Sequence, residues 1–151
     1  MCSEHNSVLI RESWGHNLNP MFHWLRKKST ALSGAPAVRR QKTYSAQSGY
    51  VYQYFYEGQR PMSSQRGTEY VFNVSPDRKT SSQVSIFISD EAMASWQQES
   101  GRALSATERY AIAKMSLFQA FDERETPEAA CAGVQVGPAD VRAILASLNI
   151  D

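Results

Sequence analysis

Residues 49–57 read GYVYQYFYE, and this stretch decides the fold because a tyrosine stands at every second position. A period of two residues points successive side chains to opposite faces of a β-strand. The four tyrosines that share the first face are Tyr50, Tyr52, Tyr54 and Tyr56. The stretch therefore predicts a strand with one aromatic face, and with Val51, Gln53 and Phe55 on the other face.

Two further β-rich runs follow this strand. Residues 68–74 place Tyr70, Phe72 and Val74 on one face, and residues 83–88 alternate through Val84, Ile86 and Ile88. Gly, Pro, Ser and Asp between the runs are typical of turns. We therefore expect a small antiparallel sheet of about three strands, at approximately 49–57, 68–74 and 83–88.

Helical patterns dominate the chain after Ser89. We expect helices at approximately 90–99, 105–123 and 138–148, and a short helical turn between Pro127 and Cys131. The helix 105–123 is the best marked, because Ser105 and Glu108 have the spacing of a capping box. Strands followed by helices, rather than alternating with them, predict an α+β fold with an antiparallel sheet.

The charge of the chain is divided unevenly along its length. Residues 1–43 carry seven Lys/Arg and two acids, for a net charge of +5, whereas residues 44–151 carry nine Lys/Arg and thirteen acids, for −4. Residues 29–38 are rich in small side chains, as linkers are. We expect a basic, flexible arm over 1–43 and a single domain over 44–151.

The composition and the cysteine count favour a soluble, cytoplasmic protein without a membrane span. No apolar run approaches the roughly 18 residues of a transmembrane helix. The two cysteines, Cys2 and Cys131, stand near opposite ends of the chain and do not resemble the disulfide framework of a small secreted domain.

Catalytic and metal-binding patterns are weak. The three histidines, His5, His16 and His23, all fall in the expected arm, away from Cys131, and no pair of ligands has the spacing of a structural zinc site. Glycine patterns that cradle a nucleotide are absent from the sequence. We expect no enzyme, no cofactor and no metal; a hydrolase using Cys131 or the Asp122 and Glu123 pair is the weaker alternative.

Binding through the aromatic strand remains the leading hypothesis. Its candidate residues are Tyr50, Tyr52, Tyr54, Tyr56, Arg60 and Arg66. Exposed aromatic side chains suit a protein partner or a second copy of the chain. The alternative is single-stranded nucleic acid, with bases on the tyrosines and phosphates on Arg39, Arg40 and Lys42 of the arm. The nature of the surface depends on which face of the strand the helices cover.

Overall fold

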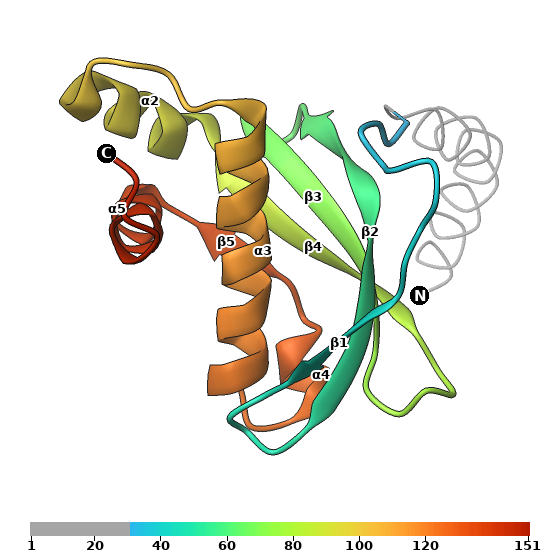
Figure 1. Ribbon diagram of the computed structural model, residues 1–151. Coiled ribbons are helices and arrows are strands. Elements are labelled where there is room, and N and C mark those ends of the chain that lie inside the picture. Colours follow the sequence, from blue (N-terminus) through green and yellow to red (C-terminus); the bar gives the residue numbers. More distant parts are fainter. Residues whose placement is uncertain (1–30) are drawn as a thin grey trace, which may run out of the picture. The chain divides into compact units, whose positions relative to one another are not determined.

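A five-stranded sheet organises residues 31–151, the part of the chain that the computed structural model describes (Figure 1). The strands are β1 (Lys42–Ser45), β2 (Val51–Met62), β3 (Gly67–Ser75), β4 (Ser82–Ser89) and β5 (Val134–Val136). They lie in the order β1-β2-β3-β4-β5, with antiparallel pairs throughout except for β4 and β5, which are parallel. The α+β class is confirmed, but the sheet is larger than predicted and mixed rather than purely antiparallel.

The two additional strands are short and carry little signal in the sequence. β1 reads KTYS and β5 reads VQV. Alternation over so few residues does not stand out from loop composition, and the parallel pairing of β5 depends on a helical crossover from β4. The three predicted strands correspond to β2, β3 and β4.

β2 continues well beyond the predicted end of its strand. The pairing with β3 shifts register between Tyr56 and Gly58, which marks a β-bulge, and then runs on to Met62. Gly58 has φ +132°, a conformation that side-chain-bearing residues rarely adopt. A bulge absorbs one extra residue and lets the pairing continue beyond it. The sequence from Gly58 onward therefore forms ladder pairs although its composition resembles that of a loop.

The chain before β1 packs against the bulge. Ser33 and Gln59 exchange two backbone hydrogen bonds, of 2.9 and 2.8 Å. A β-carbon at Gly58 would lie 2.9 Å from the carbonyl oxygen of Ser33, so only glycine allows this approach. The compact unit thus begins at Leu32, and residues 32–43, assigned to the arm from sequence, form part of it. The rest of the predicted arm, residues 1–30, lies outside the described residues.

Four helices in the described residues come after β4 in the chain, and β5 stands between the last two of them. They are α2 (Asp90–Ser100), α3 (Ala106–Glu123), α4 (Pro127–Ala130) and α5 (Pro138–Ser147). Ser89 caps α2, and Gly101 ends it in the left-handed conformation. The predicted capping box is present at α3: Glu108 donates its backbone N–H to the Ser105 hydroxyl and accepts from the Ser105 backbone N–H.

The tyrosine face of β2 points into the core, where α3 lies across the sheet (Figure 1). Tyr52 is fully buried and stacks on Phe121 with ring centroids 4.1 Å apart. Tyr44 of β1 stacks on Phe118 at 4.2 Å. Such pairs contribute about 0.5–1.5 kcal/mol beyond the area that they bury. The helices therefore cover the aromatic face, and Val51 on the other face is 43% exposed.

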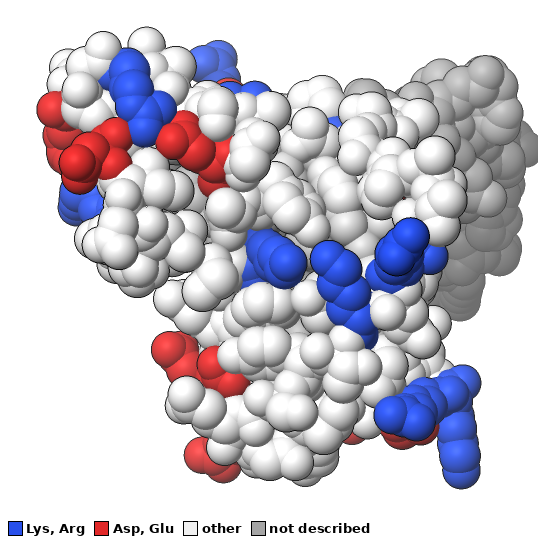
Figure 2. All heavy atoms as spheres, in the orientation of Figure 1, with Lys and Arg blue, Asp and Glu red and all other residues white. Residues whose placement is uncertain are grey.

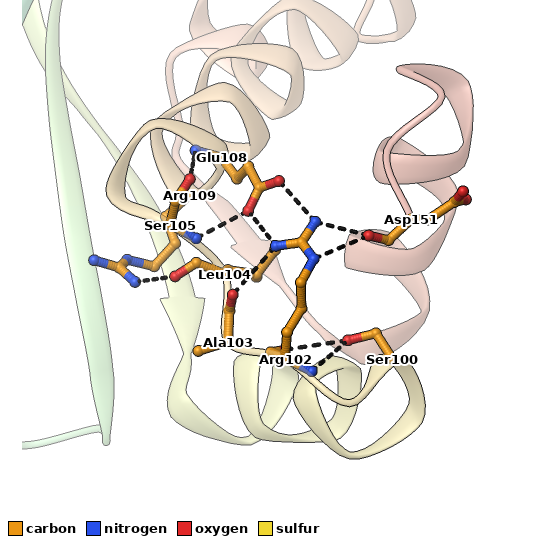
Figure 3. Close-up of polar contacts among 8 residues, drawn as sticks. All are labelled: Ser100, Arg102, Ala103, Leu104, Ser105, Glu108, Arg109 and Asp151. Carbon is orange, nitrogen blue, oxygen red and sulfur yellow. Dashed lines mark hydrogen bonds and ion pairs between the residues drawn. The ribbon is translucent and has the colours of Figure 1, made fainter.

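A polar cluster centred on Arg102 ties the connection between α2 and α3 to the segment after α5 (Figure 3). The Arg102 guanidinium donates to both carboxylate oxygens of Glu108, at 3.0 and 2.9 Å, and to the backbone carbonyl of Asp151 at 2.7 Å. It also lies 4.8 Å from the ring centroid of Trp96. One side chain thus connects the capping box of α3, the aromatic ring of α2 and residue 151.

Candidate binding cavity beside the aromatic strand

A cavity opens where the chain leaves the edge of β2. Ser33 pairs with Gln59, and the next pairing on this edge of β2 is that of Lys42 with Tyr54. Residues 34–41 connect these two pairings, whereas β2 covers the same span with residues 55–58 alone. The longer segment 34–41 therefore bends away from β2, and we call it the arch. The space under the arch has a volume of about 620 Å³, within the roughly 300–1,000 Å³ of typical ligand sites.

Three elements supply the walls. The floor is the edge of β2, one wall is the first half of α3, and the other wall is the arching segment. The lining residues are Tyr54, Phe55, Tyr56 and Gln59 from β2, Ala106, Thr107 and Tyr110 from α3, Gly34, Pro36, Val38 and Arg40 from the arch, and Lys42 from the start of β1. The lining is therefore aromatic and aliphatic, with one cation on the arch and one where the arch meets β1.

Three tyrosines provide polar groups inside this apolar lining. Tyr54, Tyr56 and Tyr110 are neutral at physiological pH, as an ordinary tyrosine with a pKa of about 10 is, and burial raises the pKa of each of them further. The rings of Tyr56 and Tyr110 meet edge to face at 4.8 Å. Neutral phenols both donate and accept hydrogen bonds, so the cavity combines aromatic contact area with a few directional polar contacts.

The charged residues that line the cavity are all cations. Its lining includes Arg40 and Lys42 and no acidic residue. Lys114, one helical turn beyond Tyr110, does not line the cavity. Its pKa is lowered by burial and by the charge of Lys42. Figure 2 shows Lys and Arg side chains gathered in the middle of this face, with acidic side chains toward the two ends of α3. The site is suited to an anionic ligand with an apolar part.

The structure places the four predicted tyrosines in three different surroundings. Tyr54 and Tyr56 line the cavity, whereas Tyr52 is buried beneath α3, and its hydroxyl has no hydrogen-bond partner in the described structure. Tyr50 is 39% exposed at the start of the strand.

Arg60 and Arg66 are both remote from the tyrosines in the cavity. Arg60 is in an ion pair with Glu69 on β3, at 2.7 Å. Arg66 stands in the turn between β2 and β3, where its carbonyl accepts from the backbone N–H of Asp90. Neither side chain lines the cavity, so the cations that do line it are the pair Arg40 and Lys42.

Sequence reasoning missed most of the cavity. Tyr110 and Thr107 fall within the helix expected at 105–123, and nothing in the sequence marks them as cavity residues. Arg40 and Lys42 are plainly basic in the sequence, but they fall in the expected flexible arm. The available signal is the cluster RRQK at 39–42, which is separated from the predicted aromatic strand by residues 43–48.

The groups considered for catalysis are occupied or weakly reactive. Burial raises the pKa of the Cys131 thiol, which leaves less of the nucleophilic thiolate. Asp122 accepts hydrogen bonds on both oxygens, from the Tyr44 hydroxyl at 2.7 Å and from the Gln47 backbone N–H at 2.9 Å. Asp122 therefore fastens the turn before β2 to the end of α3.

One serine hydroxyl contacts a carboxylate on the other face of the sheet. Ser85 donates to Glu69, which also accepts from Arg60. Burial raises the pKa of Glu69, but the bonds from Ser85 and Arg60 outweigh it and lower the pKa overall. A carboxylate with a lowered pKa is a poor general base for a serine hydroxyl. Within residues 31–151, no group of His, Cys, Asp and Glu could hold a metal ion.

Comparison with protein-family models, with curated proteins and with solved structures gives no match for this chain. No helix in the described region has the length and apolar character needed to cross a bilayer.

Proposed function

We propose that this chain is a non-enzymatic protein-interaction module that binds a short segment of a partner protein in the cavity between the arch, β2 and α3. The observation that carries the proposal is the acid-free lining, in which aromatic side chains stand beside Arg40 and Lys42. A volume of about 620 Å³ accommodates an apolar anchor side chain with part of its flanking backbone. Buried aromatic pockets of this kind supply most of the affinity in protein interfaces.

The aromatic strand acts in this proposal through the edge of β2 rather than through a broad exposed surface. Tyr52 and Tyr54 are 0% and 5% exposed, so α3 already occupies most of the tyrosine face. What stays accessible is the part of Tyr54 and Tyr56 that faces the arch. A partner segment would extend the aromatic core through this opening.

Single-stranded nucleic acid is the competing ligand. It is supported by the cations of the arch, with the Arg39 guanidinium 5.9 Å from the Phe55 ring centroid. Two observations favour the protein partner: few rings are open for base stacking, and residues 44–151 carry thirteen acids against nine Lys/Arg. A binding surface for nucleic acid needs open stacking platforms and a basic groove.

The proposal is tested by selecting peptides from a random display library with the full chain and with two tryptophan variants. Thr107→Trp fills the cavity from an exposed position on α3, and Gln98→Trp adds the same ring at an exposed position on α2. We expect the wild type and Gln98→Trp to enrich the same peptides, each with an aromatic or aliphatic anchor, and Thr107→Trp to lose at least about tenfold in affinity for them.

Two results contradict the proposal. One is equal binding of the selected peptides by Thr107→Trp, which would place the contact outside the cavity. The other is preferential binding of fluorescent single-stranded oligonucleotides, with an affinity that falls steeply as salt increases, because that slope reports the release of counterions from phosphates. Light scattering on the same samples shows whether self-association occupies the cavity.

A further inference from the structure

A second cavity lies beside the turn between β3 and β4 (Figure 1). Its volume is about 400 Å³, within the roughly 300–1,000 Å³ of small-molecule sites. Its walls come from the end of the arch, from β1, β2 and β3, and from residues 78–81 of the turn. The described residues that line it are all polar: amide side chains, hydroxyl side chains and the cations Arg78 and Lys79. This lining is the opposite of the aromatic and aliphatic one under the arch.

A cross-strand row of side chains forms one wall of this second cavity. Thr43 of β1 pairs with Gln53 of β2, and Gln53 pairs with Ser75 of β3. Residues directly opposite each other on paired strands point to the same face of the sheet, so the three side chains lie together. Gln53 follows Tyr52, which stacks on Phe121 of α3, and successive residues of a strand alternate between faces. The row therefore lies on the face of the sheet opposite α3.

Gln53 is a buried polar residue with an unsatisfied acceptor. It is 5% exposed, and its Oε1 has no hydrogen-bond partner in the described structure. An unpaired buried acceptor destabilises the fold by an amount that an apolar side chain of similar shape would not cost. Buried polar groups nearly always have a partner. Because Gln53 lines the cavity, a ligand hydroxyl can donate the missing hydrogen bond.

Arg78 and Lys79 supply positive charge from a turn that is fixed by its own hydrogen bonds. The backbone N–H of Arg78 donates to the Ser75 hydroxyl at 2.9 Å, and the backbone N–H of Lys79 donates to the Asp77 carboxylate at 2.8 Å. Asp77 also accepts from the backbone N–H of Thr80 at 2.8 Å, and it does not line the cavity. Among the ion pairs formed within residues 31–151, none includes Arg78 or Lys79. The two cations therefore suit an anionic group of a ligand.

We propose that this second cavity binds a small sugar phosphate, with the phosphate on Arg78 and Lys79 and a sugar hydroxyl on Gln53. A phosphate monoester carries a charge of about −1.5 to −2 at pH 7, which matches two cations better than a single carboxylate does. Sugar hydroxyls suit the amide and hydroxyl lining because all these groups donate and accept. The site does not depend on the proposed peptide-binding cavity, and a nucleobase or an apolar anchor needs walls of a different kind.

The test is isothermal titration calorimetry of the full chain with a panel of pentose and hexose phosphates, with their parent sugars, inorganic phosphate and glucuronate for comparison. We expect at least one sugar phosphate to bind at least about tenfold more tightly than its parent sugar and than inorganic phosphate. Arg78→Gln and Lys79→Gln should each weaken this binding about tenfold. Arg66→Gln, in the exposed turn at the other end of β3, is the matched control and should bind like the wild type.

Gln53→Met separates a binding role from a structural one, because methionine has a similar length and no hydrogen-bonding amide. We expect this variant to bind the sugar phosphate about tenfold more weakly, with a melting temperature that is unchanged or raised because the unpaired acceptor is gone. Unchanged affinity together with a lowered melting temperature would show that Gln53 serves the fold, and would overturn its assignment to the sugar.

The comparison ligands give the remaining outcomes. If no sugar phosphate binds, or if binding is unchanged in Arg78→Gln and Lys79→Gln, the site is refuted while the peptide-binding proposal stands. If inorganic phosphate binds as tightly, the sugar is refuted, and if glucuronate binds more tightly, the phosphate is refuted. Tighter binding of a single-stranded oligonucleotide that is lost in Arg78→Gln would assign the cavity to a nucleic-acid backbone instead.

Discussion

At the scale of single residues, the hydrogen bond between Tyr44 and Asp122 joins the first strand to the last turn of α3. The Tyr44 hydroxyl donates to Asp122 at 2.7 Å while its ring stacks on Phe118. The helix dipole disfavours an acid at the C-terminal end of a helix, so a cation would be the expected partner of Asp122. In the structure, Asp122 instead accepts from neutral donors in the segment around β1. These donors cannot be recognised in the sequence until β1 has been located.

Tyr44→Phe should separate the hydrogen bond from the stacking, because phenylalanine keeps the ring and loses the hydroxyl. We expect a loss of about 1 kcal/mol in the free energy of unfolding, measured by urea denaturation at neutral pH. Burial and Asp122 raise the pKa of Tyr44 to about 12 from 10.0. The hydroxyl contribution is therefore complete below pH 10 and disappears as the pH rises through about 12. A variant as stable as the wild type at neutral pH would contradict this role.

Lys114 illustrates what a residue's identity does not reveal. In the sequence it is an ordinary polar position on the helix 105–123, and the residue whose charge lowers its pKa is not near it in the chain. That residue, Lys42, stands 72 positions away on β1. The effect of Lys42 on the pKa of Lys114 could not be predicted without the position of β1 against α3, although each lysine is plain in the sequence.

At the scale of elements, local signals predicted structure well where the element is long and periodic. The tyrosine alternation predicted β2, and the Ser105 and Glu108 spacing predicted the start of α3. β1 and β5 were missed because their positions depend on neighbours: β1 on the edge of β2, and β5 on the edge of β4. The end of β2 was misplaced because Gly58 and Pro61 resemble a loop while the bulge keeps the strand paired.

Glu108 gives a test at the start of α3. Its pKa is lowered to about 2 from 4.5, first by the hydrogen bonds from Arg102 and then by the backbone N–H of Ser105. The stabilising contribution of a depressed carboxylate is complete above the unfolded value, near pH 4.5, and is lost as the pH falls through about 2. Between pH 5 and pH 2, the wild type should therefore lose more of its unfolding free energy than Glu108→Gln.

This comparison is made by urea denaturation of both proteins over the same pH series. Glu91→Gln on α2 is the control, because Glu91 also lies in the first turn of a helix but is exposed and has no arginine partner in the described structure. Parallel pH profiles for the wild type and Glu108→Gln would show that the cluster around Arg102 does not stabilise the fold through this carboxylate.

At the scale of the whole folded unit, the cavity exists because two pairings fix the ends of the arch. Ser33 is held at Gln59 and Lys42 at Tyr54, and the chain between them is longer than the strand that it spans. The sequence does not indicate either pairing, because each depends on how the irregular segment before β1 aligns with β2. The aromatic floor was therefore predictable, but the cavity under the arch was not.

The boundary of the unit provides the last prediction. A chain that begins at Leu32 contains the arch, β1 and the cavity, whereas a chain that begins at Ala46 lacks all three. The shorter chain loses the Tyr44 ring from Phe118, its hydrogen bond to Asp122, and the two bonds between Ser33 and Gln59. We expect it to be less stable than the longer chain by about 2 kcal/mol or more, as measured by urea denaturation.

The longer chain should also retain binding of the selected peptides. The shorter chain lacks Arg40 and Lys42, so it should not bind them. Equal stability of the two chains would mean that residues 32–45 contribute nothing to the sheet. Equal peptide binding would place the contact outside the arch. The segment before β2 both completes the sheet and supplies the charged wall of the cavity. Its removal must therefore weaken folding and peptide binding together, and either of these results would refute that double role.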